Sequence, residues 1–484
     1  MRICIVAEGC YPYVVGGVSG WINSMIKSFP EHEFVVLSII SDRSLSGKFK
    51  YELPENVTEV YEAYLNDDDW GNKPKEGRRT HLSPKQYRAL RSVIFNYEPE
   101  WYALFDLFQK TAFSIDDILM GADFLHIVQE YYDKNFSQIV FSDFLWTMRS
   151  IYMPLFLIMK TRIPKADVYH CVATGYAGLL GSMAKYLQGC SLIVSEHGIY
   201  TREREEELLK ASWVAGIYKN IWIEQFRKMS KLAYDRADAV TALYSHAKEL
   251  QIELGCKESK ITVTPNGIDV GRFDNLLGKY ADEEDTINIG AVVRVTPIKE
   301  IKTMIRAFAF AKKEVPNIKL WIMGPTDEDE EYAKECYELV EIMEIKDVVF
   351  TGRVNVADYL GRMDFTILTS ISEGQPLTIL ESFAAKKPVI ATDVGDCREL
   401  IYGSEEDSFG AAGIICHIMN VEEIAHAITE LALVKEKRIQ MGEAGYRRVV
   451  NEYRVDMMKE KYDEIYKSMR AKLFDETTKE RWTD

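Results

Sequence analysis

The sequence lacks the close cysteine pairs that mark disulfide frameworks and zinc sites. Its eight cysteines are scattered along the chain, and no two of them form a C-x-x-C pair. This spacing excludes a cysteine-rich secreted scaffold. It predicts reduced, mostly buried thiols.

The sequence also lacks an apolar run suited to crossing a membrane. The nearest candidate is the stretch 139–159, which is interrupted by Asp143, Arg149 and Pro154. The N-terminal run MRICIVAEG is too short for a signal peptide and instead predicts a buried first strand. We therefore expect a cytoplasmic protein, with peripheral contact at the inner face of the cell membrane left open.

Basic residues are too few to suggest a nucleic-acid partner. The 59 Lys and Arg side chains are outnumbered by 75 Asp and Glu, which gives a formal net charge of -16. A surface of this sign repels a phosphate backbone, although a few converging cations in one cleft can still bind a phosphorylated small molecule. We expect no nucleic acid among the partners.

The composition and length of the chain indicate a folded protein with more than one hydrophobic core. Hydrophobic residues make up 47% of the 484 residues and charged residues 28%, and a domain usually takes roughly 100 to 200 residues. Two series of short apolar runs alternate with helical patterns, which predicts two α/β domains with parallel sheets. The runs are 3–7, 34–40, 168–172, 191–195 and 239–243 in the first series, and 287–292, 319–323, 348–351, 365–369 and 388–392 in the second.

The turn-forming segment TVTPNGIDVGRFD separates the two series. We predict an N-terminal domain at 1–268, with a mostly helical insertion at about 42–165, and a second domain at 269–453. The remaining stretch, 454–484, is predicted to be a helix with an apolar face followed by a polar tail.

The loop after the first predicted strand, EGCYPYVVGGVSGW, places Gly16 and Gly17 before a helix. Adjacent glycines let backbone amides approach an anion at a helix start. The loop is neither G-x-G-x-x-G nor a P-loop. A tight turn explains these glycines equally well.

Ligands of open parallel sheets bind beyond the carboxyl ends of the strands, so the residues that follow each strand are the candidates for function. His197 follows the predicted strand 191–195, where an imidazole can hydrogen-bond a sugar hydroxyl or fix a turn. Arg294 and Lys299 follow 287–292. Two cations there can neutralise the charge that grows on a departing diphosphate, but their spacing alone fits ordinary surface residues better.

The segment LTSISEGQPLTILESFAAKKPVIATD predicts a strand, a short loop and a helix with Pro376 in its first turn. Glu373 lies in the loop and Glu381 in the helix, where carboxylates can accept paired hydroxyls of a sugar and a ribose. The amides of Leu377 and Thr378 at the helix start suit a phosphate. Taken in isolation, the two carboxylates fit solvated charges better than a binding site.

These places occur together, and in the same order, in the GT-B glycosyltransferases of family 4, which the sequence resembles over nearly all of 260–450. Glu373 and Glu381 have the spacing of that family's E-x7-E motif, and Arg294 with Lys299 matches its basic pair. Gly17 matches its N-terminal glycine loop, and Gly324 in WIMGP matches a turn of its donor domain. The sequence departs from the family at Asp396, which follows Gly395 where a second glycine is common.

The resemblance implies two Rossmann-like domains facing each other across a cleft, with the last helix crossing back to the first domain. It implies a metal-independent hexosyltransferase that retains anomeric configuration, without a protein nucleophile and without a cofactor. The implied catalytic residues are His197, Arg294, Lys299 and Glu373. The implied donor- and nucleotide-binding residues are Gly17, Gly324, Arg353, Val354, Gly374, Gln375, Leu377, Thr378 and Glu381.

A narrower resemblance, to the glycosyltransferases of Pel exopolysaccharide synthesis, is carried by three features. These are the segments EGCYPYVVGGVSGW and SEHGIYTRERE and the long insertion. That resemblance implies a UDP-sugar donor, with UDP-glucose expected, and a polysaccharide acceptor. It also implies work beside a membrane-bound synthesis and export complex.

Several alternatives stay open at this point. Two D-x-D matches, at 67–69 and 327–329, would suit a metal-dependent glycosyltransferase, but both lie in acidic runs typical of solvated loops. Other activities of the same fold are an epimerase or a phosphorylase. A non-catalytic nucleotide-sugar sensor or scaffold is a different class. The aromatic and basic stretch 209–234 predicts a core helix, or a helix lying on a membrane surface.

Overall fold

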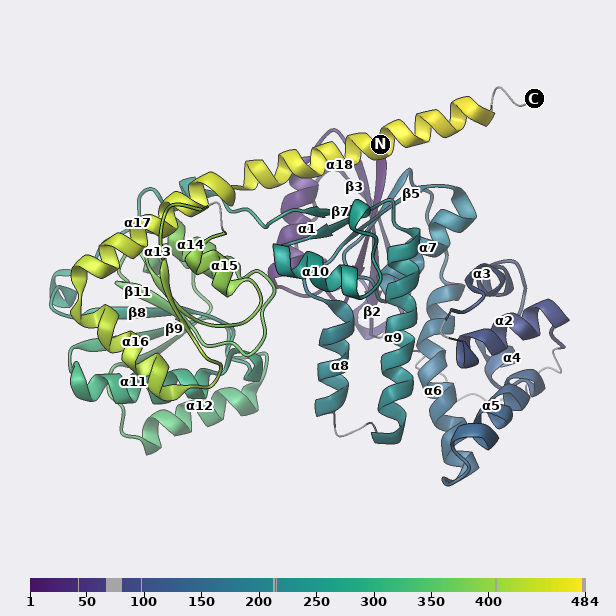
Figure 1. Ribbon diagram of the computed structural model, residues 1–484, viewed down its shortest axis with the longest axis horizontal. Helices are drawn as coiled ribbons and strands as arrows, with labels where there is room; N and C mark the ends of the chain where they lie inside the picture. The colour runs from purple at the N-terminus through teal and green to yellow at the C-terminus, as the bar shows by residue number, and fades with distance from the viewer. Residues whose placement is uncertain are drawn as a thin grey trace. The chain divides into compact units, whose positions relative to one another are not determined.

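The computed structural model describes residues 1–41, 43–66, 81–96, 98–211, 214, 216–404 and 407–480. These residues fold into two compact units. The N-terminal unit consists of Met1–Val263 and the chain from Asp463 onward, and the C-terminal unit is Thr264–Tyr462. Each unit has its own parallel sheet (Figure 1). Each also has its own buried apolar core.

The sheet of the N-terminal unit has seven strands in the order β3-β2-β1-β4-β5-β6-β7, and all of its paired strands are parallel. The order reverses between β1 and β4, which makes this the switch point of a doubly wound sheet. The strands are β1 (Arg2–Glu8), β2 (Glu33–Ile40), β3 (Val57–Tyr64), β4 (Val168–Cys171), β5 (Ser191–Ser195), β6 (Ala239–Ala242) and β7 (Ile261–Val263).

The sheet of the C-terminal unit repeats this plan with six parallel strands in the order β10-β9-β8-β11-β12-β13. Its switch point lies between β8 and β11. The strands are β8 (Ile287–Val292), β9 (Ile318–Met323), β10 (Val348–Gly352), β11 (Phe365–Leu368), β12 (Val389–Thr392) and β13 (Gly413–Cys416). The predicted α/β class with two parallel sheets is confirmed. The prediction succeeded because strands covered on both faces have near-continuous apolar sequences, which stand out from the rest of the chain.

Helices cover both sheets (Figure 1). Those of the N-terminal unit outside the insertion are α1 (Gly17–Ser28), α7 (Tyr176–Gln188), α8 (Tyr200–Lys210), α9 (Gly216–Arg236) and α10 (Ser245–Glu253). In the C-terminal unit the helices are α11 (Ile301–Glu314), α12 (Glu330–Ile342), α13 (Ala357–Leu360), α14 (Leu377–Ala384), α15 (Cys397–Tyr402), α16 (Val421–Leu433) and α17 (Lys435–Glu452). Short 3-10 turns are η1 (Arg43–Leu45), η2 (Glu258–Lys260), η3 (Val270–Phe273), η4 (Ala281–Glu283) and η5 (Pro297–Lys299).

The stretch 42–165 contains one strand in addition to its helices. β3 pairs only with β2 at the edge of the sheet and carries Glu59 and Glu62. An edge strand with polar positions has no apolar run, so the sequence pattern misses it. The helices are α2 (Pro84–Phe95), α3 (Trp101–Gln109), α4 (Ile115–Leu119), α5 (Ala122–Asn135) and α6 (Phe141–Lys160), of which the first four gather around α6 (Figure 1).

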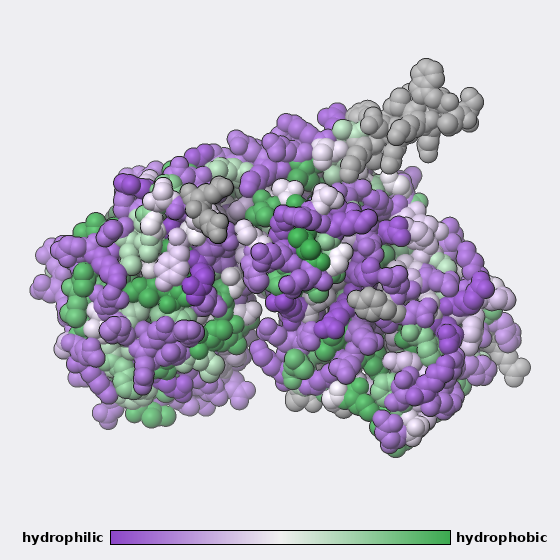
Figure 2. Space-filling model, in the orientation of Figure 1, coloured by the Kyte–Doolittle hydropathy of each residue, from purple (hydrophilic) through white to green (hydrophobic). Residues whose placement is uncertain are grey.

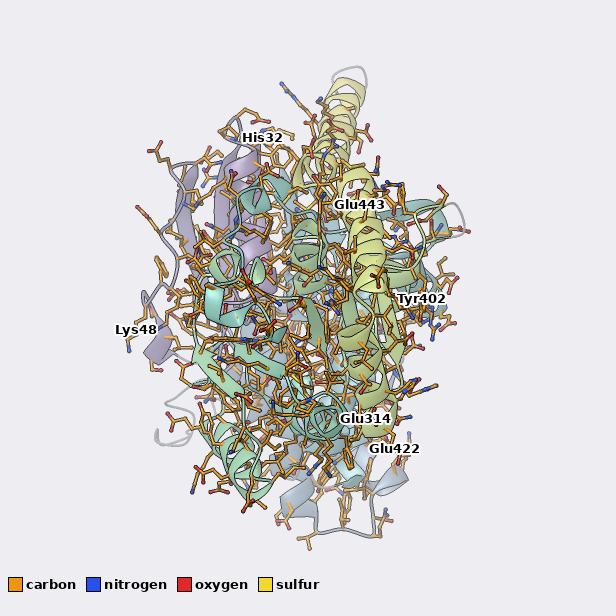
Figure 3. The ribbon with its side chains drawn as sticks, turned by 90° about the vertical axis from the view of Figure 1, so that its left-hand side faces the viewer. His32, Lys48, Glu314, Tyr402, Glu422 and Glu443 are labelled. Carbon is orange, nitrogen blue, oxygen red and sulfur yellow. The ribbon has the colours of Figure 1, made fainter. Side chains whose placement is uncertain are left out.

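The last helix, α18 (Val455–Glu480), divides between the two units after Tyr462. Within the N-terminal unit its Tyr466 is fully buried and its hydroxyl lies 2.8 Å from Nδ1 of His170 on β4. Phe29 and His32 pack against the Tyr466 ring, and His32 is labelled in Figure 3. The chain segments 264–268 and 453–455 are also hydrogen-bonded to each other, through Ile268 to Tyr453 and Val455.

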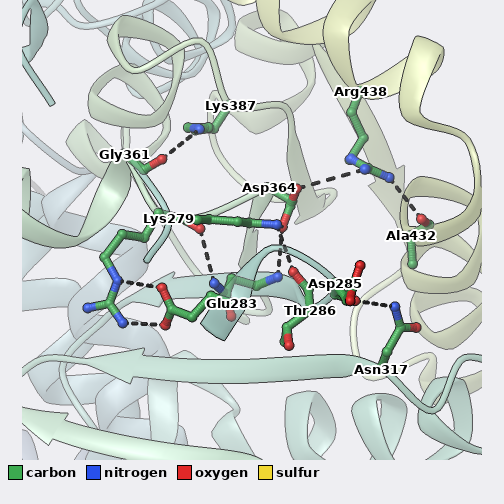
Figure 4. A network of polar contacts seen from close by, with 12 residues as sticks. Lys279, Glu283, Asp285, Thr286, Asn317, Gly361, Asp364, Lys387, Ala432 and Arg438 are labelled. Carbon is green, nitrogen blue, oxygen red and sulfur yellow. Dashed lines mark hydrogen bonds and ion pairs between the residues drawn. The ribbon is translucent and has the colours of Figure 1, made fainter. Parts of the chain in front are cut away.

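A polar network closes the C-terminal sheet at the amino ends of β8 and β11 (Figure 4). The Lys279 ammonium lies 2.6 Å from an Asp364 carboxylate oxygen and donates to the carbonyl of Thr286. The same carboxylate accepts the amide N–H of Asn288. Because these charges satisfy one another at the edge away from the strand carboxyl ends, we assign them to stability.

Exposed carboxylates contribute to the acidic balance of the surface. Glu314 at the end of α11 and Glu422 at the start of α16 are two of them (Figure 3), and the face seen in Figure 2 is mainly hydrophilic. Among the described residues, no helix combines the length and the apolar character that a membrane crossing requires.

Candidate active site

The switch point of the C-terminal sheet brings Lys299 and Glu373 together. Lys299 ends η5 after β8, and Glu373 lies in the loop after β11. The Lys299 Nζ is 2.5 Å from Oε1 of Glu373, and the two side chains are 16% and 11% exposed. The two groups are adjacent beyond the carboxyl ends of β8 and β11, the position at which doubly wound sheets bind their ligands, so a cation and a carboxylate are available to one small molecule.

Glu381 lies in α14, the helix that follows the Glu373 loop. Its carboxylate makes no hydrogen bond to any described residue. Burial raises the pKa of Glu381, and the Arg272 guanidinium on η3 lowers it by less. The first turn of α14 carries Leu377 and Thr378. Pro376 occupies the N-cap position just before the helix, whereas the sequence predicts it in the first turn. A buried carboxylate with no hydrogen-bond partner among the described residues is suited to accept hydroxyls from a ligand.

The loop between Glu373 and α14 is anchored by buried polar groups. The side-chain oxygen of Gln375 accepts the amide N–H of Asn266 at 2.6 Å, and its NH2 donates to Asp396 at the same distance. The Asp396 N–H donates to the carbonyl of Gly374. Burial raises the pKa of Asp396 well above its usual range. A second glycine at 396 would remove the partner of Gln375, so this departure from the family pattern has a structural role here.

Glycine is required at 395 and 324 by close backbone approach. A Cβ at Gly395, whose φ is 53°, would lie 2.2 Å from the Glu373 carbonyl oxygen. A Cβ at Gly324 would lie 1.9 Å from the carbonyl oxygen of Val293, next to Arg294. Gly324 therefore sets how closely the loop after β9 approaches the loop that carries Arg294. The Arg294 side chain is 45% exposed and pairs with Glu328 at 2.7 Å.

Replacing Gly324 with alanine is expected to destabilise the protein by about 3 kcal/mol, because the new Cβ must displace a backbone carbonyl. Denaturant unfolding followed by circular dichroism measures this. The matched control is Gly278→Ala, since a Cβ at Gly278 meets no atom within 4 Å. Equal unfolding midpoints for the two variants would contradict the assignment.

Arg353 and Val354 follow β10, the edge strand, which β9 separates from the switch point. Arg353 is exposed. Val354 packs against the small cluster of Trp321, Met323 and Met363. Among the interactions that the structure describes, neither Arg353 nor Val354 contacts Lys299 or Glu373.

His197 and Gly17 belong to the N-terminal unit. His197 follows β5, and its ring packs edge-on against Trp21 with centroids 4.3 Å apart. Its Nε2 is buried and has no hydrogen-bond partner within the described part of the chain. Burial lowers the pKa of His197 to about 4, so the ring is neutral at pH 7. A Cβ at Gly17, the first residue of α1, would meet no atom within 4 Å, which leaves the space beside this helix start open.

The neighbouring Glu196 has a structural role that sequence reasoning missed. It is buried and accepts hydrogen bonds from the hydroxyls of Thr174 and Tyr234, the amide of Gln251 and the Tyr200 N–H. Because every contact is a donor, the carboxylate is fully paired and holds the start of α8. Its position directly after a buried strand, beside His197, was the available signal.

The two D-x-D matches do not form a metal site that the structure describes. Residues 67–69 lie outside the described residues. Asp329 caps α12 by accepting the Tyr332 N–H at 3.0 Å. In the described ranges, no group of three or more His, Cys, Asp and Glu residues is arranged to hold a metal ion.

Two family models match the chain in the two halves that the structure separates. Residues 1–259 match the family described as "Domain of unknown function (DUF3492)". Residues 273–448 match "Glycosyl transferases group 1". The second match covers Lys299, Glu373 and Glu381, whereas the first covers His197.

Curated relatives include glycosyltransferases with different substrates. The N-acetyl-alpha-D-glucosaminyl L-malate synthase of Bacillus anthracis is 29% identical over 243 residues, which is 49% of this chain and 61% of that protein. The alpha-monoglucosyldiacylglycerol synthase of Streptococcus pneumoniae is 33% identical over 27% of this chain and 32% of its own length. The alpha-maltose-1-phosphate synthase of Mycolicibacterium smegmatis is 24% identical over 65% and 82%. The chain thus spans less than two thirds of the length of the first two of these relatives.

Solved structures resemble almost the whole chain. HepE of Anabaena, in complex with UDP and glucose, has a TM-score of 0.60 at 15% identity, covering 97% of this chain and 100% of that one. Sucrose-phosphate synthase from Thermosynechococcus elongatus has a TM-score of 0.61 at 14% identity, with coverages of 97% and 99%. At this identity the likeness establishes the fold, which is the GT-B architecture predicted from the sequence.

Proposed function

Since the chain belongs, through residues 1–259, to the family described as DUF3492 and joins it to a glycosyl transferases group 1 domain at 273–448, we propose that it transfers a hexosyl group from a UDP-sugar. The observation that carries this proposal is the Lys299–Glu373 pair at the switch point of the C-terminal sheet, followed by Glu381 on α14. Lys299 at the end of η5 provides a cation for a diphosphate, and the loop after β11 and the helix that follows it provide carboxylates for hydroxyls.

In the proposed reaction, Lys299 and Arg294 neutralise the diphosphate, Glu373 accepts a hydroxyl of the donor sugar, and Glu381 accepts the ribose hydroxyls. His197 acts as a neutral hydrogen-bonding group for the sugar. The bond between the sugar C1 and the phosphate oxygen breaks while an acceptor hydroxyl forms its bond to C1 on the same face. The proton of that hydroxyl passes to the departing phosphate, so no protein nucleophile is needed. Charge stabilisation by the cations supplies most of the acceleration.

We further propose UDP-glucose as the donor and a growing exopolysaccharide as the acceptor, handled at the cytoplasmic side beside a membrane-bound synthesis and export complex. Support for the donor comes from HepE, whose structures contain UDP, UDP-glucose and glucose. Support for the acceptor is the resemblance of the glycine loop and the His197 segment to the Pel glycosyltransferases. Arg353 and Val354 are assigned to the nucleotide base, and Gly17, Gly324, Gly374, Gln375, Leu377 and Thr378 to the donor through their backbone positions.

The direct test is calorimetric titration of the protein with UDP, UDP-glucose, UDP-N-acetylglucosamine and GDP-mannose in EDTA. The expected result is binding of UDP and preferential binding of UDP-glucose without a metal. Binding that appears only on adding Mg²⁺ or Mn²⁺ would overturn metal independence. Binding without any hydrolysis or transfer would favour a scaffold or sensor, an isomerised sugar would identify an epimerase, and no binding to any of the four would refute the donor assignment.

A further inference from the structure

Buried hydroxyl groups join the loop that carries Lys299 to the loop that carries Glu373. Thr369 and Ser370, directly after β11, are 1% and 0% exposed. The Thr369 hydroxyl donates to the carbonyl oxygens of Lys299 at 3.0 Å and Glu300 at 3.2 Å. The Ser370 hydroxyl donates to Oε1 of Glu373 at 2.5 Å. The two residues thus reach the two charged groups from one short segment.

Thr369 supports a backbone conformation that is costly on its own. Glu300 has a φ of 48° and lies in the left-handed region, which a residue with a side chain adopts rarely. Its carbonyl is held by Thr369, and the Ile371 N–H donates to the neighbouring carbonyl of Ile298 at 2.9 Å. These bonds fix the turn from η5 into α11, and with it the direction of Lys299 at the end of η5. Such a conformation persists where its surroundings over-determine it.

Ser370 determines which oxygen of Glu373 is available. Oε1 accepts both the Lys299 ammonium and the Ser370 hydroxyl, whereas Oε2 makes no hydrogen bond within the described part of the chain. Ser370 is itself held, because its carbonyl accepts the hydroxyl of Thr392 on β12 at 2.5 Å. The carboxylate is therefore clamped by one oxygen and presents the other.

We propose that Thr369 and Ser370 are positioning residues for the transfer reaction, with different tasks. Thr369 holds Lys299 in place for the diphosphate, and Ser370 turns Glu373 so that Oε2 meets a hydroxyl of the donor sugar. This inference rests on the proposed function. It assigns the two hydroxyls to preorganisation of charged groups, which contributes to catalysis because the groups need not reorient during the reaction.

The division of tasks predicts two different binding patterns. Ser370→Ala is expected to weaken binding of UDP-glucose by about tenfold, through the loss of one hydrogen bond to a charged group. Binding of UDP should stay unchanged, because UDP lacks the hexose whose hydroxyl Glu373 accepts. Thr369→Val is expected to weaken UDP and UDP-glucose alike and to lower the rate of donor turnover. Calorimetry with both ligands and release of UDP from UDP-glucose measure these effects.

Conservative variants and a matched control separate positioning from general stability. Ser370→Thr and Thr369→Ser keep the hydroxyls and should restore binding. Thr366→Val removes another buried hydroxyl, on β11 just before Thr369, which donates to Ser382. It should lower the unfolding midpoint without changing the ratio of UDP to UDP-glucose affinity. If the wild type binds both ligands and Ser370→Ala keeps that ratio, the positioning role is wrong. If the wild type binds neither ligand, the proposed function is wrong and the inference falls with it.

Discussion

Replacing Lys299 by alanine is expected to lower donor turnover by about 100- to 1000-fold, as happens when one preorganised donor to a developing negative charge is removed. Lys299 faces the switch point and is mostly buried, so bulk water cannot replace it. The substitution also leaves Glu373 beside an empty position, with only the Ser370 hydroxyl on Oε1. Affinity for UDP should fall together with the rate, because the diphosphate is present in both.

The control for Lys299 is Lys302→Ala, which removes an ammonium from the first turn of α11. Lys302 pairs with Glu335 on α12 and lies outside the proposed site. Release of UDP from UDP-glucose and calorimetry with UDP should be measured for both variants, after circular dichroism has shown that each is folded. If the turnover of Lys299→Ala stays within threefold of the wild type, Lys299 does not stabilise the departing diphosphate.

Replacing Glu381 by glutamine is expected to weaken UDP binding and to stabilise the protein at pH 7. The carboxylate accepts both ribose hydroxyls in the proposed complex, and an amide has one oxygen to accept them. Loss of one hydrogen bond to a charged group corresponds to about tenfold or more in affinity. Without ligand, however, burial raises the pKa of Glu381, so its ionised form is disfavoured in the folded state. Glutamine removes that cost.

The sign of the pH dependence follows from the same raised pKa. The unfolded chain releases the Glu381 proton at a lower pH than the folded chain, so this group lowers stability as the pH rises above the ordinary carboxyl range. UDP affinity shows the opposite trend, since the ionised carboxylate is the better acceptor. Affinity should therefore fall on acidification at a pH above the usual range of a glutamate, and Glu381→Gln should remove this step.

Calorimetry with UDP between pH 5 and 8 and thermal unfolding of the wild type and Glu381→Gln measure both effects. Arg272→Ala provides a second check, because the Arg272 guanidinium lowers the pKa of Glu381. Its removal should shift the affinity step to higher pH. A Glu381→Gln variant that binds UDP as well as the wild type, or that is less stable at pH 7, would contradict the role of this carboxylate.

The sequence predicted the fold well where strands are covered on both faces. The runs at 191–195 and 287–292 coincide with β5 and β8, because a buried parallel strand needs an uninterrupted apolar sequence. β3, β7 and the edge strand β13 were missed. β3 lies at a sheet edge with glutamates on it, and β7 has only three residues with no buried position. A pattern of this length and polarity does not differ from a loop.

The part of the candidate site that lies directly after strands was predicted from the sequence. The residues that support it were not. Glu373 and Lys299 are 74 residues apart, yet both follow strands at one switch point, so their approach follows from topology. Arg272 and Thr369 gave no signal of their own, and Asp396 stood out only as a departure from the family pattern. Their roles depend on which backbone groups approach within hydrogen-bonding distance, and single residue types such as Thr and Asp occur equally in ordinary turns.

The sequence by itself determined two α/β units with parallel sheets, their covering helices and the charged residues that follow several of the strands, because hydrophobic periodicity and position after a strand are local properties of the chain. Only the tertiary structure decided that Lys299 pairs with one oxygen of Glu373, that Ser370 shares that oxygen, and that Gln375 is tied to Asn266 and Asp396. These contacts join segments far apart in the sequence. Their geometry is set by how loops pack over the sheet edge, which no local pattern encodes.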